Sequence, residues 1–190
     1  AGLAIAAAIV VTGGMAEDAI ADAADGLFGG ATRERRLEIM KDSRHGTYGV
    51  AALCLSLLLR AAALAALAEI QPVAAATVWL TATLMARSAS MWLTVALPAA
   101  RLDGLSASVG RVTRPAFFMG ALFAVILGLV IAAPSTGLAG FLFAVVLIAA
   151  IAWGWSDLCR RLVGGQTGDL IGALHAILEI AALGAFLLFI

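Results

Sequence analysis

The feature that most constrains this fold is a series of long apolar runs separated by short polar loops. An apolar run of about 20 residues crosses a bilayer as a helix, because a helix satisfies its own backbone hydrogen bonds. We expect such helices at residues 48–68, 73–97, 115–133, 138–157 and 170–190. No alternation typical of strands is found. The sequence therefore predicts an all-α, polytopic integral membrane protein of about six transmembrane helices, the first of them only partly present.

Composition supports membrane insertion. Hydrophobic residues make up 63% of the 190 residues and charged residues only 13%, whereas a soluble domain is about half apolar and a quarter charged. The formal net charge is zero, which gives no reason to expect a nucleic-acid partner. The two cysteines, Cys54 and Cys159, have the spacing of neither a disulfide framework nor a zinc site.

We interpret residues 1–190 as a single membrane-embedded catalytic domain. The apolar run at residues 1–11 is too short to span a bilayer. We interpret it as the end of a longer helix, and expect the domain to lack an N-terminal segment in this chain.

The basic residues are distributed unequally between the two sides that these helices define. Ten of the twelve Lys and Arg residues fall on loops of one side, and the positive-inside rule makes that side cytoplasmic. We therefore expect a multi-pass protein of the cell inner membrane whose polar loops, and active site, face the cytoplasm.

The acidic residues are concentrated in residues 12–48, which contain seven of the twelve. Asp18, Asp22 and Asp25 are spaced i, i+4 and i+7, so they share one helix face within roughly 60° of arc. A divalent cation would relieve their repulsion, and carboxylate oxygens suit Mg²⁺ bound together with substrate phosphates. The alternative is a solvated acidic turn followed by an ordinary basic loop.

Other polar segments are weaker candidates. The basic residues Lys41 and Arg44 follow the acidic face and are suited to phosphates. The sequence GGQTGD at residues 164–169 precedes a helix, where glycines and the helix N-terminus favour an anion; Asp169 also fits a plain helix N-cap. The loop at residues 98–110 supplies Arg101 and Asp103, and alone it fits an ordinary loop.

Four ionisable residues lie inside apolar runs. Arg87 is flanked by small residues, and we expect it to face a cavity rather than to snorkel. For Arg60, nearer the opposite side, we expect snorkelling or pairing with another helix. Glu179 lies four residues after His175 on one face, which is compatible with a structural pair and equally with a functional one.

Several of these segments together resemble the cobalamin synthase family, the membrane-bound adenosylcobinamide-GDP ribazoletransferases. The resemblance rests on TGG at residues 12–14, D-x3-D-x2-DG at 18–26, RRLEIMKDSRHGTYG at 35–49, ARLDGL at 100–105 and GGQTGD-x2-GA at 164–173, with Glu179 beyond. They occur in the family's order and spacing over nearly the whole chain. This chain departs from the family at Ala16, where a histidine is usual, and at Ala19, where a glycine is usual.

The resemblance implies a transferase of cobalamin biosynthesis that joins adenosylcobinamide-GDP to α-ribazole or its 5′-phosphate and releases GMP, with Mg²⁺ as cofactor. We assign Mg²⁺ to Asp18, Asp22 and Asp25, with Glu17 in support. Lys41, Arg44 and Arg101 would neutralise the diphosphate and the departing GMP. Asp42 or a metal-site aspartate would accept the hydroxyl proton. The remaining substrate-binding candidates are Arg87, Asp103, Gln166, Thr167 and Asp169, and the last three would bind a substrate edge or a second metal.

Two other protein classes share some of these features. A CDP-alcohol phosphatidyltransferase would carry DG-x2-AR-x8-G-x3-D-x3-D, but no AR follows Asp25 and Gly26 and the later aspartates are missing. A divalent-cation transporter would place its acids at the membrane midplane, whereas these lie at the edge beside a basic loop. Close packing of Ala- and Gly-rich helices also permits a homo-oligomer.

Overall fold

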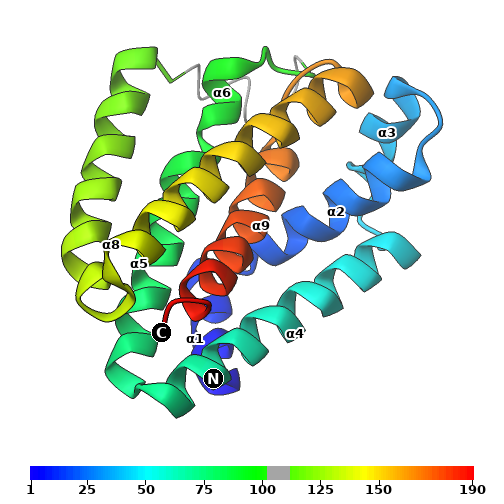
Figure 1. Ribbon diagram of the computed structural model, residues 1–190. Helices are drawn as coiled ribbons and strands as arrows, with labels where there is room; N and C mark the ends of the chain where they lie inside the picture. Colours follow the sequence, from blue (N-terminus) through cyan, green and yellow to red (C-terminus); the bar gives the residue numbers. More distant parts are fainter. Residues whose placement is uncertain (102–111) are drawn as a thin grey trace.

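The structure is a computed structural model that describes residues 1–101 and 112–190. These residues are helical, with one isolated bridge between Ala99 and Gln166 and no strand among them, as predicted. Figure 1 shows the arrangement of the helices. Their bounds are α1 Gly2–Thr12, α2 Met15–Gly29, α3 Arg33–Ile39, α4 Thr47–Ile70, α5 Pro72–Ser90, α6 Trp92–Ala96, α8 Arg114–Val163 and α9 Gly168–Leu187.

Helix α8 is a hairpin of two helical arms. Gly137 lies inside it with φ 69° and ψ 165°, and Pro134 precedes this break. Figure 1 shows the chain reversing its direction here. The two arms correspond to the separate helices predicted at residues 115–133 and 138–157, and the turn between them is confirmed.

The N-terminal helices α1 and α2 meet at a sharp break. Gly13 and Gly14 both adopt left-handed backbone conformations, with φ 68° and 66°, which glycine adopts without the steric cost that a Cβ brings. The two helices are bent by 88° at this point. The TGG sequence at residues 12–14 thereby turns α2 sharply away from the direction of α1.

Two helix boundaries differ from the prediction. The sequence predicts a helix over about residues 16–24 that is ended by Gly26, Gly29 and Gly30. Gly26 instead lies within α2, where its missing side chain lets Met40 and the Arg36 carbonyl pack directly against the helix. The helix expected at residues 73–97 is divided into α5 and α6, and the break follows Ser90, whose hydroxyl donates to the Arg87 carbonyl at 3.0 Å. Hydroxyl bonds of this kind compete with the regular backbone bonds of a helix.

Helix α9 is the centre of the bundle and contacts α2, α4, α5 and α8 (Figure 1). By length and composition, α4, α8 and α9 are long and apolar enough to cross a membrane, and the bent pair of α1 and α2 counts as a fourth if it is one span. Large apolar side chains on α4 and α8, such as Leu55, Leu58, Phe118 and Val130, are exposed. Lipid would cover such faces, as expected for a polytopic membrane protein.

The polar connections gather at one end of the bundle. Figure 1 shows α3, α6 and the α8–α9 connection at this end, and the α4–α5 turn at the other. Arg36 of α3 fixes part of this end by donating to the Leu27 carbonyl at 3.2 Å and the Leu162 carbonyl at 3.3 Å. These carbonyls belong to the last turns of α2 and α8, so α3 is docked across two helix C-termini.

Candidate active site

Acidic side chains from two helices face each other at the polar end. Asp18 is exposed and Asp22 half-buried on α2, and both are close enough to Asp169 of α9 for their charges to repel. The two helices approach closely at Gly172, where an added Cβ would collide with that of Ala19. We call Asp18, Asp22 and Asp169 the acidic edge.

Asp25 shares the helix face but has a different environment. It is only 6% exposed, and its carboxylate accepts hydrogen bonds from the backbone N–H of Gly46 at 2.6 Å and of Gly49 at 2.8 Å. Asp25 therefore docks the start of α4 onto α2. Its assignment as a metal ligand stays a prediction, and both carboxylate oxygens already have backbone donors.

Replacing Gly49 by alanine should destabilise the protein. A Cβ at this position would collide with the Asp25 carboxylate, and displacing a charged acceptor from its hydrogen bonds costs about 1.5–3 kcal/mol each. We expect a fall of several degrees in the unfolding temperature of the detergent-solubilised protein. Gly154→Ala is the matched control, since that helical glycine has open space around it; equal unfolding temperatures for the two variants would contradict the docking role.

The acidic edge suits one mode of Mg²⁺ binding. Within residues 1–101 and 112–190, no group of three or more His, Cys, Asp or Glu side chains is arranged to hold a metal ion. Mg²⁺, however, is commonly bound by one or two carboxylates together with waters and substrate phosphates. Asp18 and Asp22 fit this requirement, because both lie on one helix face and no backbone donor among the described residues engages their oxygens.

A basic segment lies beside the acidic edge. His45 Nδ1 is 3.6 Å from Asp22 Oδ1, which brings the end of this segment to α2. The Arg44 guanidinium donates to both oxygens of Asp42, at 3.0 and 2.7 Å, and lowers the pKa of that carboxyl to about 2. Lys41 is exposed next to this pair. The contact places His45 beside the acids, and the phosphate-binding roles of Lys41 and Arg44 stay predictions.

The GGQTGD segment at residues 164–169 supplies further residues to this site. The Asp169 carboxylate accepts from Arg101 at 2.8 Å, so two residues predicted separately form one ion pair. Thr167, rather than Asp169, is the N-cap of α9, because its hydroxyl accepts from the Leu170 N–H at 3.2 Å. Asp103 lies outside the described residues.

Gln166 fixes the position of this segment. Its backbone N–H donates to the Pro98 carbonyl and its carbonyl accepts from the Ala100 N–H, both at 2.8 Å. Its side chain is buried, and its Oε1 has no hydrogen-bond partner among the residues that the structure describes. The contribution of Gln166 through its side chain stays a prediction.

The charged residues of the apolar runs form a buried network. Arg60 donates to Glu17 Oε1 at 2.6 Å and lies 3.5 Å from Glu179 Oε1. The Trp79 indole N–H donates to the same Glu179 oxygen at 2.7 Å, and His175 Nε2 is 3.9 Å from Glu179 Oε2. Of the two expectations for Arg60, pairing with another helix is the correct one. Its partners were missed because sequence spacing pairs residues only within a helix.

This network lies in the wall of a polar chamber of about 460 Å³ between the α1–α2 break, α5 and α9. Arg87 lines the chamber as predicted, and its side chain is exposed. Ala16, at the position where the family usually has histidine, is also part of the wall. Trp79 and Thr83 were not predicted; the only sequence signal for this chamber is the ionisable residues within apolar runs.

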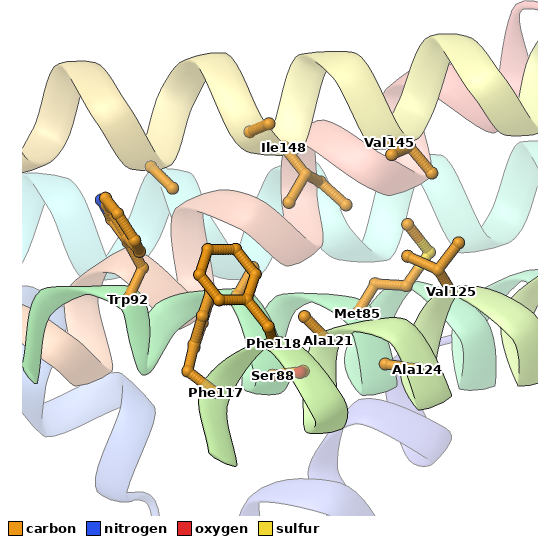
Figure 2. Close-up of a pocket in the computed structure, with 13 residues that line it drawn as sticks. Met85, Ser88, Trp92, Phe117, Phe118, Ala121, Ala124, Val125, Val145 and Ile148 are labelled. Atoms are coloured by element: carbon orange, nitrogen blue, oxygen red, sulfur yellow. The ribbon is translucent and has the colours of Figure 1, made fainter. Parts of the chain in front are cut away.

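A second hollow of about 340 Å³, between α5, α6 and both arms of α8, has a different character. Figure 2 shows it lined by Met85, Trp92, Phe117, Phe118 and other apolar side chains, with Ser88 as its one polar residue. We call it the apolar groove. The described residues that line it offer no charged group to a diphosphate or a metal ion, so the acidic edge and the polar chamber are the better candidates for chemistry.

The chain is similar to known proteins over nearly its whole length. The family described as "Cobalamin-5-phosphate synthase" matches residues 1–187. A protein of Azorhizobium caulinodans named adenosylcobinamide-GDP ribazoletransferase is 43% identical over 187 residues, covering 98% of this chain and 71% of the relative. Relatives of the same name from a Sinorhizobium species and from Sinorhizobium medicae are 42% and 41% identical over 189 and 195 residues, covering 97% and 98% of this chain and 71% and 72% of theirs. No solved structure matches.

Proposed function

The chain belongs to the cobalamin-5-phosphate synthase family, and from this premise we propose that it is an adenosylcobinamide-GDP ribazoletransferase. It transfers the phospho-cobinamide group of adenosylcobinamide-GDP to α-ribazole or α-ribazole 5′-phosphate. The observation that carries the proposal is the family match over residues 1–187, together with acids and basic residues that converge at one end of the bundle.

The reaction is a displacement at phosphorus. A ribose hydroxyl of the acceptor attacks the cobinamide-side phosphorus, a new O–P bond forms, and the bond to the GMP phosphate breaks. GMP leaves with the electron pair, and the hydroxyl proton passes to a carboxylate. Such chemistry depends mainly on positioning and on neutralising charge. Lys41, Arg44 and Arg101 supply the positive charge at the polar end.

The cofactor of this reaction is Mg²⁺, held by Asp18 and Asp22 at the acidic edge. When bound, the ion neutralises diphosphate charge and favours departure of GMP. The separation of Glu17 and Asp25 from this edge supports a site with few protein ligands, since Glu17 pairs with Arg60 and Asp25 with two backbone N–H groups. Asp169 stays bound to Arg101 and orients that guanidinium toward the edge.

The environment of the acids bears on which of them accepts the proton. The pKa of Asp42 is lowered to about 2 by Arg44, and an efficient base at neutral pH has a pKa closer to 7. This argues against Asp42 among the acceptors that the sequence left open. We therefore place the proton acceptor at the acidic edge.

We further place the enzyme in the cell inner membrane with the acidic edge facing the cytoplasm, following the positive-inside rule. A transporter is disfavoured by the balance of charge in the polar chamber. Glu17 and Glu179 are offset there by Arg60 and Arg87, so the chamber offers a divalent cation no net attraction. A homo-oligomer remains a proposal based on small-residue helix packing.

The test is GMP release by the detergent-solubilised protein given adenosylcobinamide-GDP and α-ribazole. We expect GMP and a cobalamin product in equal amounts, and a loss of at least tenfold when EDTA removes Mg²⁺, restored by excess Mg²⁺. Omitting α-ribazole is the control, since GMP released without it would indicate hydrolysis. Cation uptake into vesicles without GMP release would instead support the transporter.

A further inference from the structure

The polar chamber contains buried polar atoms that lack partners. His175 is only 7% exposed, and its Nδ1 has no hydrogen-bond partner among the described residues. The same is true of Arg60 Nε and Glu17 Oε2. A buried polar group without a hydrogen-bond partner is destabilising, and all three side chains line the same cavity. Such a cavity is suited to a ligand with several hydrogen-bonding groups.

We propose that the polar chamber binds the acceptor nucleoside, the ribazole moiety, with its ribose toward the acidic edge. This inference rests on the transferase function proposed above and names the place of the second substrate. The ligand class is a neutral fused-ring aromatic base joined to a ribose, which carries hydroxyl groups and a ring nitrogen that can hydrogen-bond to polar side chains of the lining.

The size of the chamber agrees with a nucleoside. Its volume of about 460 Å³ lies within the roughly 300–1,000 Å³ of small-molecule pockets. The corrin of the other substrate is far larger than a nucleoside and does not fit there. The apolar groove has a similar volume, about 340 Å³, but the part of the chain that the structure describes places no charged side chain in its lining to pair with ribose hydroxyls.

The charge of the chamber favours a neutral ligand over the diphosphate. Two glutamates and two arginines line it, so their formal charges cancel when His175 is neutral. Trp79 adds an aromatic surface to the chamber, and its indole N–H already donates a hydrogen bond to Glu179 at 2.7 Å. Rigid aromatic surfaces of this kind pack well against a flat base.

The position of the chamber matches the reaction. Glu17 and Gly168 line it, and the residues that follow them in sequence, Asp18 and Asp169, belong to the acidic edge. From Gly168 to Glu179 the chamber wall follows α9 for 11 residues, or about 16 Å at 1.5 Å per residue. A nucleoside along this wall has its base beside the buried network and its ribose at the edge where phosphorus is attacked.

The test places a bulky side chain in the polar chamber and, as a control, in the apolar groove. Ala16→Trp and Ile171→Trp each place an indole in the polar chamber from opposite helices. Ala121→Trp places the same side chain in the apolar groove (Figure 2) and is the matched control. Binding of α-ribazole and of adenosylcobinamide-GDP to the purified, detergent-solubilised proteins is measured separately by calorimetry, and unfolding temperatures verify that each variant is folded.

We expect at least tenfold weaker α-ribazole binding in a folded chamber variant, with unchanged affinity for adenosylcobinamide-GDP, and no change in either affinity for Ala121→Trp. Wild-type affinity for α-ribazole in both folded chamber variants would overturn the inference. A wild-type protein that binds α-ribazole but releases no GMP would overturn the proposed function instead, and the chamber assignment would then stand if Ala16→Trp weakens that binding.

Discussion

Replacing Asp18 with alanine should reduce GMP release by roughly 10³-fold, the upper range for the loss of one charge-stabilising group. Asp18 is exposed at the acidic edge and, with Asp22, forms the proposed Mg²⁺ site. Its loss removes an ionic ligand for the cofactor without removing a packing contact. We therefore expect normal expression and an unfolding temperature close to that of the wild type, with turnover measured as GMP formed per enzyme at saturating substrates.

Glu38→Ala is the control for Asp18→Ala. Glu38 is also an exposed acid at the polar end, and it pairs with Arg35 on the same short helix at 2.7 Å. It should retain activity. Near-wild-type turnover of Asp18→Ala would contradict the placement of the metal at the acidic edge. Asp18→Asn removes the negative charge but keeps the size of the side chain, and it should lose activity as the alanine variant does.

Replacing Arg60 with leucine should cause the largest loss of stability. Its guanidinium is almost fully buried between Glu17 and Glu179, and removing one member of a buried ion pair typically costs about 3–5 kcal/mol, because the remaining charge is left uncompensated. Here two carboxylates lose their partner. We expect a large fall in the unfolding temperature in detergent.

Arg161→Leu is the matched control for Arg60→Leu. Arg161 pairs with Asp157 at 2.6 Å one helical turn away, but its side chain is 74% exposed, and exposed pairs contribute about 0–1 kcal/mol. Adding Glu17→Gln and Glu179→Gln to Arg60→Leu should recover part of the lost stability by removing the uncompensated charges. An unfolding temperature for Arg60→Leu equal to that of Arg161→Leu would contradict a role for the buried network in stability.

Hydrophobic run length predicted most of the helices, because membrane-spanning segments depend on local composition. It did not predict that Gly26 would remain within α2. Glycine usually weakens a helix, but here its lack of a side chain is required by the packing of Met40. That contact comes from a segment 14 residues later and cannot be deduced from helix propensity.

The candidate site was predictable as a set of residues but not as an arrangement. The i, i+4, i+7 spacing indicates that Asp18, Asp22 and Asp25 share a face, but not what covers each part of it. The start of α4 covers Asp25, while α9 brings Asp169 toward the other two. Such contacts between helices depend on tertiary packing, which spacing along one helix does not contain.

The 88° break at Gly13 and Gly14 has an electrostatic consequence. After this break the chain continues as α2 from Met15, and the N-terminus of α2 lies near that of α9. Each helix N-terminus carries about half a positive elementary charge from its aligned peptide dipoles. The first turns contain Glu17 and Asp18 in α2 and Asp169 in α9. The backbone itself thus offsets part of the repulsion among these carboxylates, so the two glycines that set this bend also help to hold the acids close together.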